Sequence, residues 1–114
     1  MSKKREALIP QYAAHIQEKF SETPDLDFLD KVAVGLGPAI YNRDSSLVSG
    51  SDPSELETVK NNYLIKKLGL PDGPHLMHAI KEVIREYGTS ERTKYRVVVY
   101  YILARRFKRE SVYK

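Results

Sequence analysis

The chain of 114 residues contains no cysteine. This absence excludes disulfide bonds, thiolate nucleophiles, cysteine-ligated zinc and iron–sulfur clusters, and it fits a reducing compartment. Long apolar runs are also missing. The longest, Val97 to Ala104, has eight residues, whereas a membrane-spanning helix needs roughly 20. The basic N-terminus, Met1–Glu6, is not followed by an apolar stretch, so we expect no secretory signal, no membrane contact and a cytoplasmic location.

Composition and charge describe an ordinary globular protein with one basic end. Apolar residues make up 41% and charged residues 30%, and the length suits a single domain over residues 1–114. The formal net charge of +4 is uneven, because residues 85–114 carry nine lysines and arginines against three glutamates, whereas residues 1–84 carry −2. A basic end can attract nucleic acid, anionic lipid or an acidic partner, but a modest cluster of this kind is more often a solvated surface.

Apolar residues recur at helical spacing in five segments, which predicts an all-α fold. The first segment, about Lys3 to Phe20, contains Pro10, so either the helix kinks there or a second helix begins near it. The second segment begins at Thr23-Pro24-Asp25, with threonine as the cap and proline in the first turn. It ends at Gly35 or Gly37, where a glycine can close the helix.

The last three helices follow strong capping and turn signals. Asp52-Pro53-Ser54-Glu55 predicts a capping box, in which the glutamate reaches back to the cap amide, and a helix to about Leu68. The fourth helix spans about Pro74 to Tyr87, with an apolar face toward the core. The residues of its polar face are His75, His78, Lys81, Glu82 and Arg85.

The fifth segment, about Glu91 to Arg109, has Thr89 or Ser90 as its cap. Its centre, Val97 to Ala104, is apolar all round, which is typical of a helix in the middle of a bundle. Valine, tyrosine and isoleucine also favour a strand, but no other segment offers a strand partner. The fold we expect is a single compact bundle of about five helices.

Between the second and third helices lie eighteen residues, Gly35 to Asp52, without persistent periodicity. Loops of this length are often functional or mobile, yet this one contains Ile40, Tyr41, Leu47 and Val48. We therefore expect it to pack on the bundle, with one helical turn allowed at Pro38 to Tyr41. Its candidate functional surface consists of the polar side chains Asn42, Arg43, Asp44, Ser45, Ser46, Ser49 and Ser51.

Several short motifs together resemble a small family of bacterial proteins known only as domain of unknown function 2853. They are Gly35-Leu36-Gly37-Pro38 with Ile40-Tyr41-Asn42, Val48-Ser49-Gly50-Ser51-Asp52, Lys66-Lys67-Leu68-Gly69-Leu70, and Lys94-Tyr95-Arg96 with Tyr100-Tyr101. The resemblance covers nearly the whole chain. It implies a compact all-helical domain of the bacterial cytoplasm and assigns no activity. Pro10 departs from the uninterrupted first helix of the family.

The residues offer no convincing catalytic, cofactor or metal site. His75, His78 and Glu82 share a helix face, but that face is polar and matches no metal motif. The loop serines have no histidine close in sequence to activate them. Gly35-Leu36-Gly37-Pro38 follows a helix, whereas a phosphate-binding glycine loop follows a strand. We therefore expect a protein that is not an enzyme and needs no cofactor.

Two binding hypotheses remain. The leading one is an accessory protein that acts through a protein partner, with the polar loop at the contact. The alternative is nucleic-acid or anion binding through the basic C-terminal third, where free amides at the start of the last helix add to the cations. The cations concerned are Arg92, Lys94, Arg96, Arg105, Arg106, Lys108 and Arg109.

Overall fold

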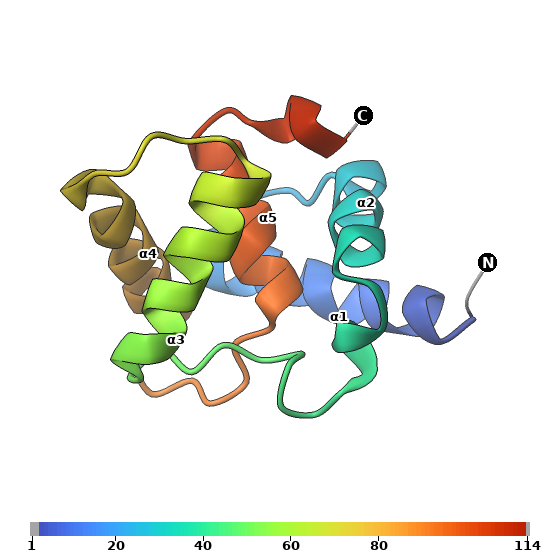
Figure 1. The fold of residues 1–114 in the computed structure, drawn as a ribbon. Helices are drawn as coiled ribbons and strands as arrows, with labels where there is room; N and C mark the ends of the chain where they lie inside the picture. The colour runs from blue at the N-terminus through green and yellow to red at the C-terminus, as the bar shows by residue number, and fades with distance from the viewer. Residues whose placement is uncertain (1–2, 114) are drawn as a thin grey trace.

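A computed structural model describes residues 3–113 of the chain (Figure 1). Within this range it contains five α-helices, three short helical segments of other types and no strand, which confirms the all-α bundle. The α-helices are α1 (Lys3–Phe20), α2 (Leu26–Leu36), α3 (Pro53–Thr58), α4 (Pro74–Tyr87) and α5 (Arg96–Arg106). The short segments are η1 (Gly37–Tyr41) and η3 (Glu110–Tyr113), both 3₁₀, and η2 (Val59–Lys67), which is π-helical.

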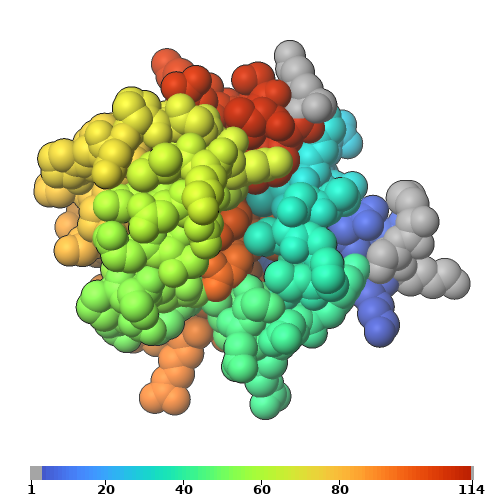
Figure 2. Space-filling view, viewed as in Figure 1, coloured from blue at the N-terminus to red at the C-terminus, as the bar shows by residue number. Residues whose placement is uncertain are grey.

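Helix α5 forms the centre of the molecule. All eight residues from Val97 to Ala104 are buried, and α1, α2 and α4 all pack against this helix. In the space-filling view α3 and η2 cover its front, and only a narrow strip of α5 is visible beside α2 (Figure 2). The expectation of a central last helix is therefore confirmed, because a helix that is apolar all round must be enclosed on every side.

Helices α2 and α4 follow their amphipathic patterns. In α4 the apolar face is buried, with Met77 only partly so, and the five polar residues predicted to face water are all exposed. The cap of α2 differs from the prediction. Asp25, not Thr23, is the cap: its carboxylate accepts a hydrogen bond from the Phe28 amide at 3.1 Å. Its own amide donates to the Tyr101 hydroxyl at 2.8 Å, which ties the cap to α5.

Helix α1 continues through Pro10 without a break. Helical spacing places the one histidine of α1, His15, on the polar face of the helix. His15 is half-buried instead, and its Nδ1 lies 2.5 Å from the Tyr87 hydroxyl of α4. The same hydroxyl accepts a hydrogen bond from the Tyr95 amide at 3.1 Å. Helical periodicity shows which face a residue occupies but not which neighbouring helix covers it.

The predicted third helix is α-helical only as far as Thr58. From Val59 to Lys67 it widens into η2, where bonds such as Leu68 N–H to the Tyr63 oxygen, at 2.9 Å, join residues five apart. Val59 and Leu64, five residues apart in this segment, are both fully buried. Asn61 and Asn62, at the centre of the segment, are weak α-helix formers.

The capping box at α3 forms only in part. The Asp52 carboxylate accepts from the Ser54 amide at 3.0 Å. Glu55, however, does not reach back to the cap: its carboxylate pairs with the Arg96 guanidinium of α5. A buried cation competes for the glutamate more strongly than a solvated backbone amide does.

The last helix is shorter at both ends than predicted. It begins at Arg96 because the backbone before it bonds to the long loop instead: Val48 N–H donates to the Lys94 oxygen and Arg96 N–H to the Ser46 oxygen, both at 2.8 Å. These bonds flank an isolated antiparallel bridge between Leu47 and Tyr95. The two loops therefore lie at the same end of the bundle (Figure 1).

Candidate functional site

The first half of the long loop uses its polar side chains to hold its own backbone. The Asn42 Oδ1 atom accepts from the Asp44 amide at 2.9 Å, and the Ser45 hydroxyl donates to the Ala39 oxygen at 2.9 Å. The Ser46 hydroxyl donates to the Arg43 oxygen at 3.3 Å. These bonds assign Asn42, Ser45 and Ser46 a structural role, and Arg43 and Asp44 extend from the surface of the turn that they stabilise.

Arg96 joins this loop to the core. Its Nε donates to the Ser45 oxygen at 2.7 Å and one terminal nitrogen to the Leu47 oxygen at 3.1 Å. The same nitrogen pairs with Glu55, and the other lies 3.4 Å from the Tyr100 hydroxyl. Of the expected apolar contacts, Ile40 and Val48 are buried as predicted, while Tyr41 is 44% exposed, contrary to expectation.

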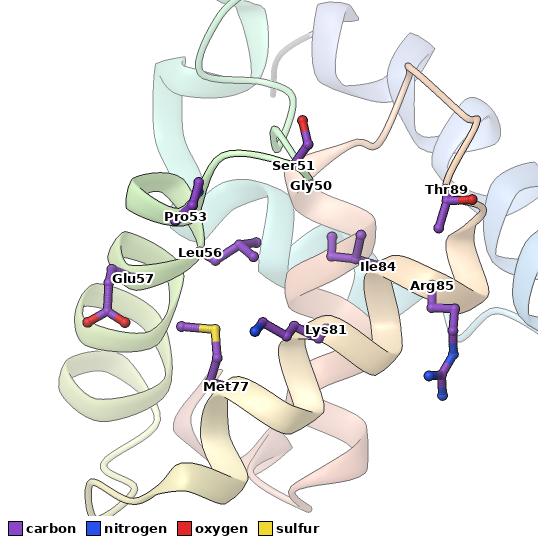
Figure 3. Close-up of a pocket in the computed structure, with 10 residues that line it drawn as sticks. All are labelled: Gly50, Ser51, Pro53, Leu56, Glu57, Met77, Lys81, Ile84, Arg85 and Thr89. Carbon is purple, nitrogen blue, oxygen red and sulfur yellow. The ribbon is translucent and has the colours of Figure 1, made fainter.

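Gly50 and Ser51 in the second half of the loop, together with Pro53 at the start of α3, line a groove between α3 and α4. The groove has a volume of about 610 Å³, a size typical of binding pockets. Leu56 from α3 and Met77 and Ile84 from α4 point into it and form an apolar floor (Figure 3). Ser51, at the loop end of the groove, is one of its lining residues, so this part of the predicted loop surface does border a cavity.

Gly50 brings the loop directly onto α4. A Cβ atom at this position would lie 2.7 Å from Cγ2 of Ile84, closer than real carbon atoms approach. In the motif Ser49-Gly50-Ser51, close packing against Ile84 therefore requires glycine at position 50. On the far side of the glycine lies a second cavity of about 360 Å³, which shares Gly50, Ser51, Ile84 and Thr89 with the groove.

The charges around the groove are unbalanced. The two acids that border the cavities are engaged elsewhere: Glu57 lies 3.4 Å from Lys60, and Glu91 lies 3.2 Å from Lys19. Lys81 reaches across the groove from α4, while Glu57 and Arg85 point away from it (Figure 3). Lys81 forms no ion pair within the described part of the chain. Beside the apolar floor, Lys81 therefore places a positive charge that no direct ion pair within residues 3–113 engages.

Lys94 and Arg92 border the second cavity and differ in their exposure to solvent. Arg92 is exposed, whereas Lys94 is 5% exposed, and its ammonium donates to the Glu91 backbone oxygen. Burial lowers the pKa of Lys94. The predicted anion site at a helix N-terminus does not form, because the helix begins only at Arg96 and the Thr93 amide already bonds to the Glu91 carboxylate at 3.1 Å.

The remaining cations of the basic third do not gather on one surface with these. Arg106 binds both carboxylate oxygens of Glu86, which lowers the pKa of that glutamate, and Arg105 lies 3.9 Å from Asp25. Lys108 and Arg109 are exposed beyond the end of α5. Helix α5 separates them from Arg92 and Lys94. The seven predicted cations therefore form three groups: Arg96, Arg105 and Arg106 are paired with acids, Arg92 and Lys94 border the second cavity, and Lys108 and Arg109 lie beyond α5.

A family model supplies the comparison with known proteins. The model described as "Protein of unknown function (DUF2853)" matches residues 11–111. The chain belongs to this family. All the motifs that carry the resemblance lie within the matched range, and Pro10 lies just before it. No curated protein matches the chain significantly.

The polar face of α4 gives this DUF2853 protein a shallow hollow and no deep pocket. His78, Lys81, Glu82 and Arg85 border about 370 Å³, all from one helix and all exposed. Among residues 3–113 no group of three or more histidine, aspartate or glutamate side chains is placed to hold a metal ion. None of the helices in that range has the length and apolarity needed to cross a bilayer.

Sequence reasoning did not find the groove of the DUF2853 chain. Leu56, Met77 and Ile84 follow the helical spacing of core residues, and at this end of the bundle the core is open. The partial exposure of Met77 depends on how far α3 stands from α4, which no local pattern encodes. The burial of Lys94 is equally hidden, because its sequence neighbours are polar.

Proposed function

We propose that the protein is a non-enzymatic accessory protein of the bacterial cytoplasm that binds an acidic, amphipathic segment of a protein partner in the groove between α3 and α4. The observation that carries the proposal is the apolar floor of Leu56, Met77 and Ile84 beneath the unpaired Lys81. An amphipathic segment with apolar anchors on one side and carboxylates beside them complements such a surface.

The shape of the groove favours a segment of protein over an enclosed small molecule. Small-molecule pockets bury most of the surface of their ligand. Here six of the ten lining residues are exposed, so the groove is an open trough along two helices. The family membership assigns no activity of its own, and the proposal therefore depends on the groove alone.

A pair of synthetic peptides tests the proposal. One is a 12-residue helix with a leucine face flanked by glutamates, and the other has lysine at every glutamate position. We expect the acidic peptide to bind saturably, with amide shifts in residues 50–57 and 77–89 in NMR spectra, and the basic peptide to bind at least tenfold more weakly.

Matched variants separate the groove from the rest of the surface. We expect Met77→Glu and Lys81→Glu each to weaken the binding of the acidic peptide about tenfold or more. A tenfold loss of affinity corresponds to about 1.4 kcal/mol. Val34→Glu on α2 places the same charge on a residue that is 53% exposed and outside the groove, and should leave binding unchanged. Equal affinity for the two peptides would contradict the proposal. Salt-sensitive binding of DNA or RNA that is lost in Lys108→Glu and Arg109→Glu would favour the alternative of nucleic-acid binding.

A further inference from the structure

Lys94 is a buried cation without a counter-ion. Lysine is rarely buried unless an acid pairs with it, yet Lys94 is 5% exposed and forms no ion pair within residues 3–113. The nearest acid in sequence is Glu91, and both of its carboxylate oxygens are engaged, one with Lys19 and the other with the Thr93 amide. The fold holds this ammonium in place without a direct ion pair within residues 3–113.

The ammonium also has hydrogen-bonding capacity to spare. It carries three N–H donors, and one of them is used by the Glu91 backbone oxygen. The aliphatic part of the side chain packs beneath Gly50, where a Cβ would lie 3.5 Å from Cδ and Cε of Lys94. The Lys94 side chain is therefore fixed by packing. Binding a ligand at its ammonium costs little further side-chain entropy.

The second cavity supplies further groups suited to an anion. Ser49, Ser51 and Thr89 border it, and none of their hydroxyls forms a hydrogen bond within the described residues. Arg92 adds a second cation at the border. One buried ammonium and one exposed guanidinium beside neutral hydroxyls fit a singly charged group better than a dianion, because Glu91 also borders the cavity.

The cavity adjoins the apolar groove. Ile84 and Gly50 border both, and Figure 3 shows Ser51 and Thr89 at the end of the groove where the two loops meet. A ligand that reached Lys94 would thus have its anionic group in the second cavity and its neighbouring atoms over the side chain of Ile84.

We propose that Lys94 is the anchor for a carboxylate carried by the occupant of the groove. The proposal rests on the proposed function, since it names the chemical group that the acidic segment would place at one end of that site. The carboxylate accepts hydrogen bonds from the ammonium and the hydroxyls around it, and the apolar part of the ligand covers Ile84. The ligand class is a monocarboxylate attached to an apolar body, whether an acidic side chain of a peptide or a free organic acid.

Sodium octanoate is the probe, with neutral methyl octanoate as the matched control. In protein labelled with ¹³C and ¹⁵N, octanoate should shift the Lys94 Cε and Hε resonances and the Thr89 amide saturably. The ester, which offers the same tail without the charge, should bind at least tenfold more weakly. Equal binding of acid and ester, or shifts that leave Lys94 unmoved, would overturn the proposal without the use of any variant.

Lys94→Met keeps the apolar stem and removes the ammonium. We expect octanoate affinity to fall at least tenfold, to the level of the ester, while the urea midpoint stays the same or rises, since an uncompensated buried charge is lost. If Lys94 served only the stability of the fold, the variant would bind octanoate as tightly as the wild type does, and its urea midpoint would fall. Lys108→Met removes an exposed cation beyond the far end of α5 and should change neither quantity; an equal loss of octanoate binding in this control would contradict the proposal.

The two proposals fail separately. If octanoate shifts Lys94 but the acidic peptide does not bind, the carboxylate site stands and the proposed partner does not. If the acidic peptide binds the groove with the same affinity in Lys94→Met, and octanoate leaves Lys94 unmoved, the partner proposal stands and Lys94 has no part in recognition.

Discussion

Arg96 connects three parts of the molecule through one planar group. Its guanidinium bonds to the Ser45 and Leu47 oxygens of the loop, to Glu55 of α3, and lies against the Tyr100 hydroxyl. The side chain is 11% exposed, and a guanidinium presents its donors in a fixed fork that no other side chain matches. The loop is therefore held by a residue that the sequence presents only as one cation among seven.

Replacement of this arginine should be costly. We expect Arg96→Gln to lower the free energy of unfolding by about 2–4 kcal/mol, because Glu55 and two backbone oxygens lose their partner in a mostly buried place. Urea denaturation measures the change. Arg92→Gln, at an exposed cation four residues earlier, should stay within about 0.5 kcal/mol of the wild type. Equal costs for the two variants would show that the bonds of Arg96 contribute nothing beyond charge.

His15 gives the protein a pH dependence in the neutral range. Burial against Tyr87 lowers its pKa from the ordinary value of 6.5. The unfolded chain therefore takes up a proton at a higher pH than the folded chain does, so acidification favours unfolding. The contribution is fully present above about pH 6.5 and is lost as the pH falls toward the lowered pKa.

Urea midpoints at several pH values test this effect. Between pH 7 and 5 the midpoint of the wild type should decrease more than that of His15→Gln, which cannot take up the proton. His78→Gln, on the exposed face of α4, should follow the wild type. Parallel curves for all three proteins would contradict the role of His15. Losses at lower pH belong to carboxylates such as Glu86, whose pKa is lowered by Arg106.

At the scale of elements, the helices that the sequence predicts best are those with local signals. The bounds of α4, Pro74 to Tyr87, agree with the prediction, because its proline and its apolar stripe lie within the segment and the terminal Gly88 follows it directly. The start of α5 at Arg96 and the widening of η2 could not be predicted, since both depend on partners distant in sequence. The groove could not be predicted either, because it arises from the spacing of two helices.

Pro10 offers a prediction for α1. A proline inside a helix loses a hydrogen bond and clashes with the preceding turn, at about 3 kcal/mol relative to alanine. Part of this cost is offset because proline also restricts the unfolded chain by about 1 kcal/mol. We expect Pro10→Ala to stabilise the protein by about 2 kcal/mol.

Pro74 is the matched control for this change. It lies in the first turn of α4, where the missing N–H has no partner in any case. Pro74→Ala should therefore destabilise slightly, by up to about 1 kcal/mol. If thermal unfolding shows the two variants to have the same sign and size, α1 is relaxed around its proline.

At the scale of the molecule, the buried centre of α5 and the loops at one end of the bundle should open at very different free energies. The centre of α5 is enclosed on all sides, and its amides can exchange with solvent only when the whole protein unfolds. The loops that border the groove contain little regular secondary structure and are held to the bundle chiefly by the bonds of Arg96 and by the pairing of Val48 with Lys94. A groove between a fixed floor and loops that open locally can admit a partner without unfolding of the core.

Hydrogen exchange followed by mass spectrometry tests this division. Peptides from residues 97–104 should exchange last and together, at the rate of global unfolding, whereas residues 42–52 and 88–95 should exchange much earlier through local opening. In Arg96→Gln the loop peptides should exchange faster still, relative to the core, than in the wild type. Saturating octanoate should slow the peptides of residues 48–53 and 84–94 and leave residues 42–46 unchanged, because the first half of the loop lies outside both cavities. Uniform protection of the whole loop would instead mean that the ligand tightens the fold as a unit, and the distinction between a structural first half and a binding second half would be wrong.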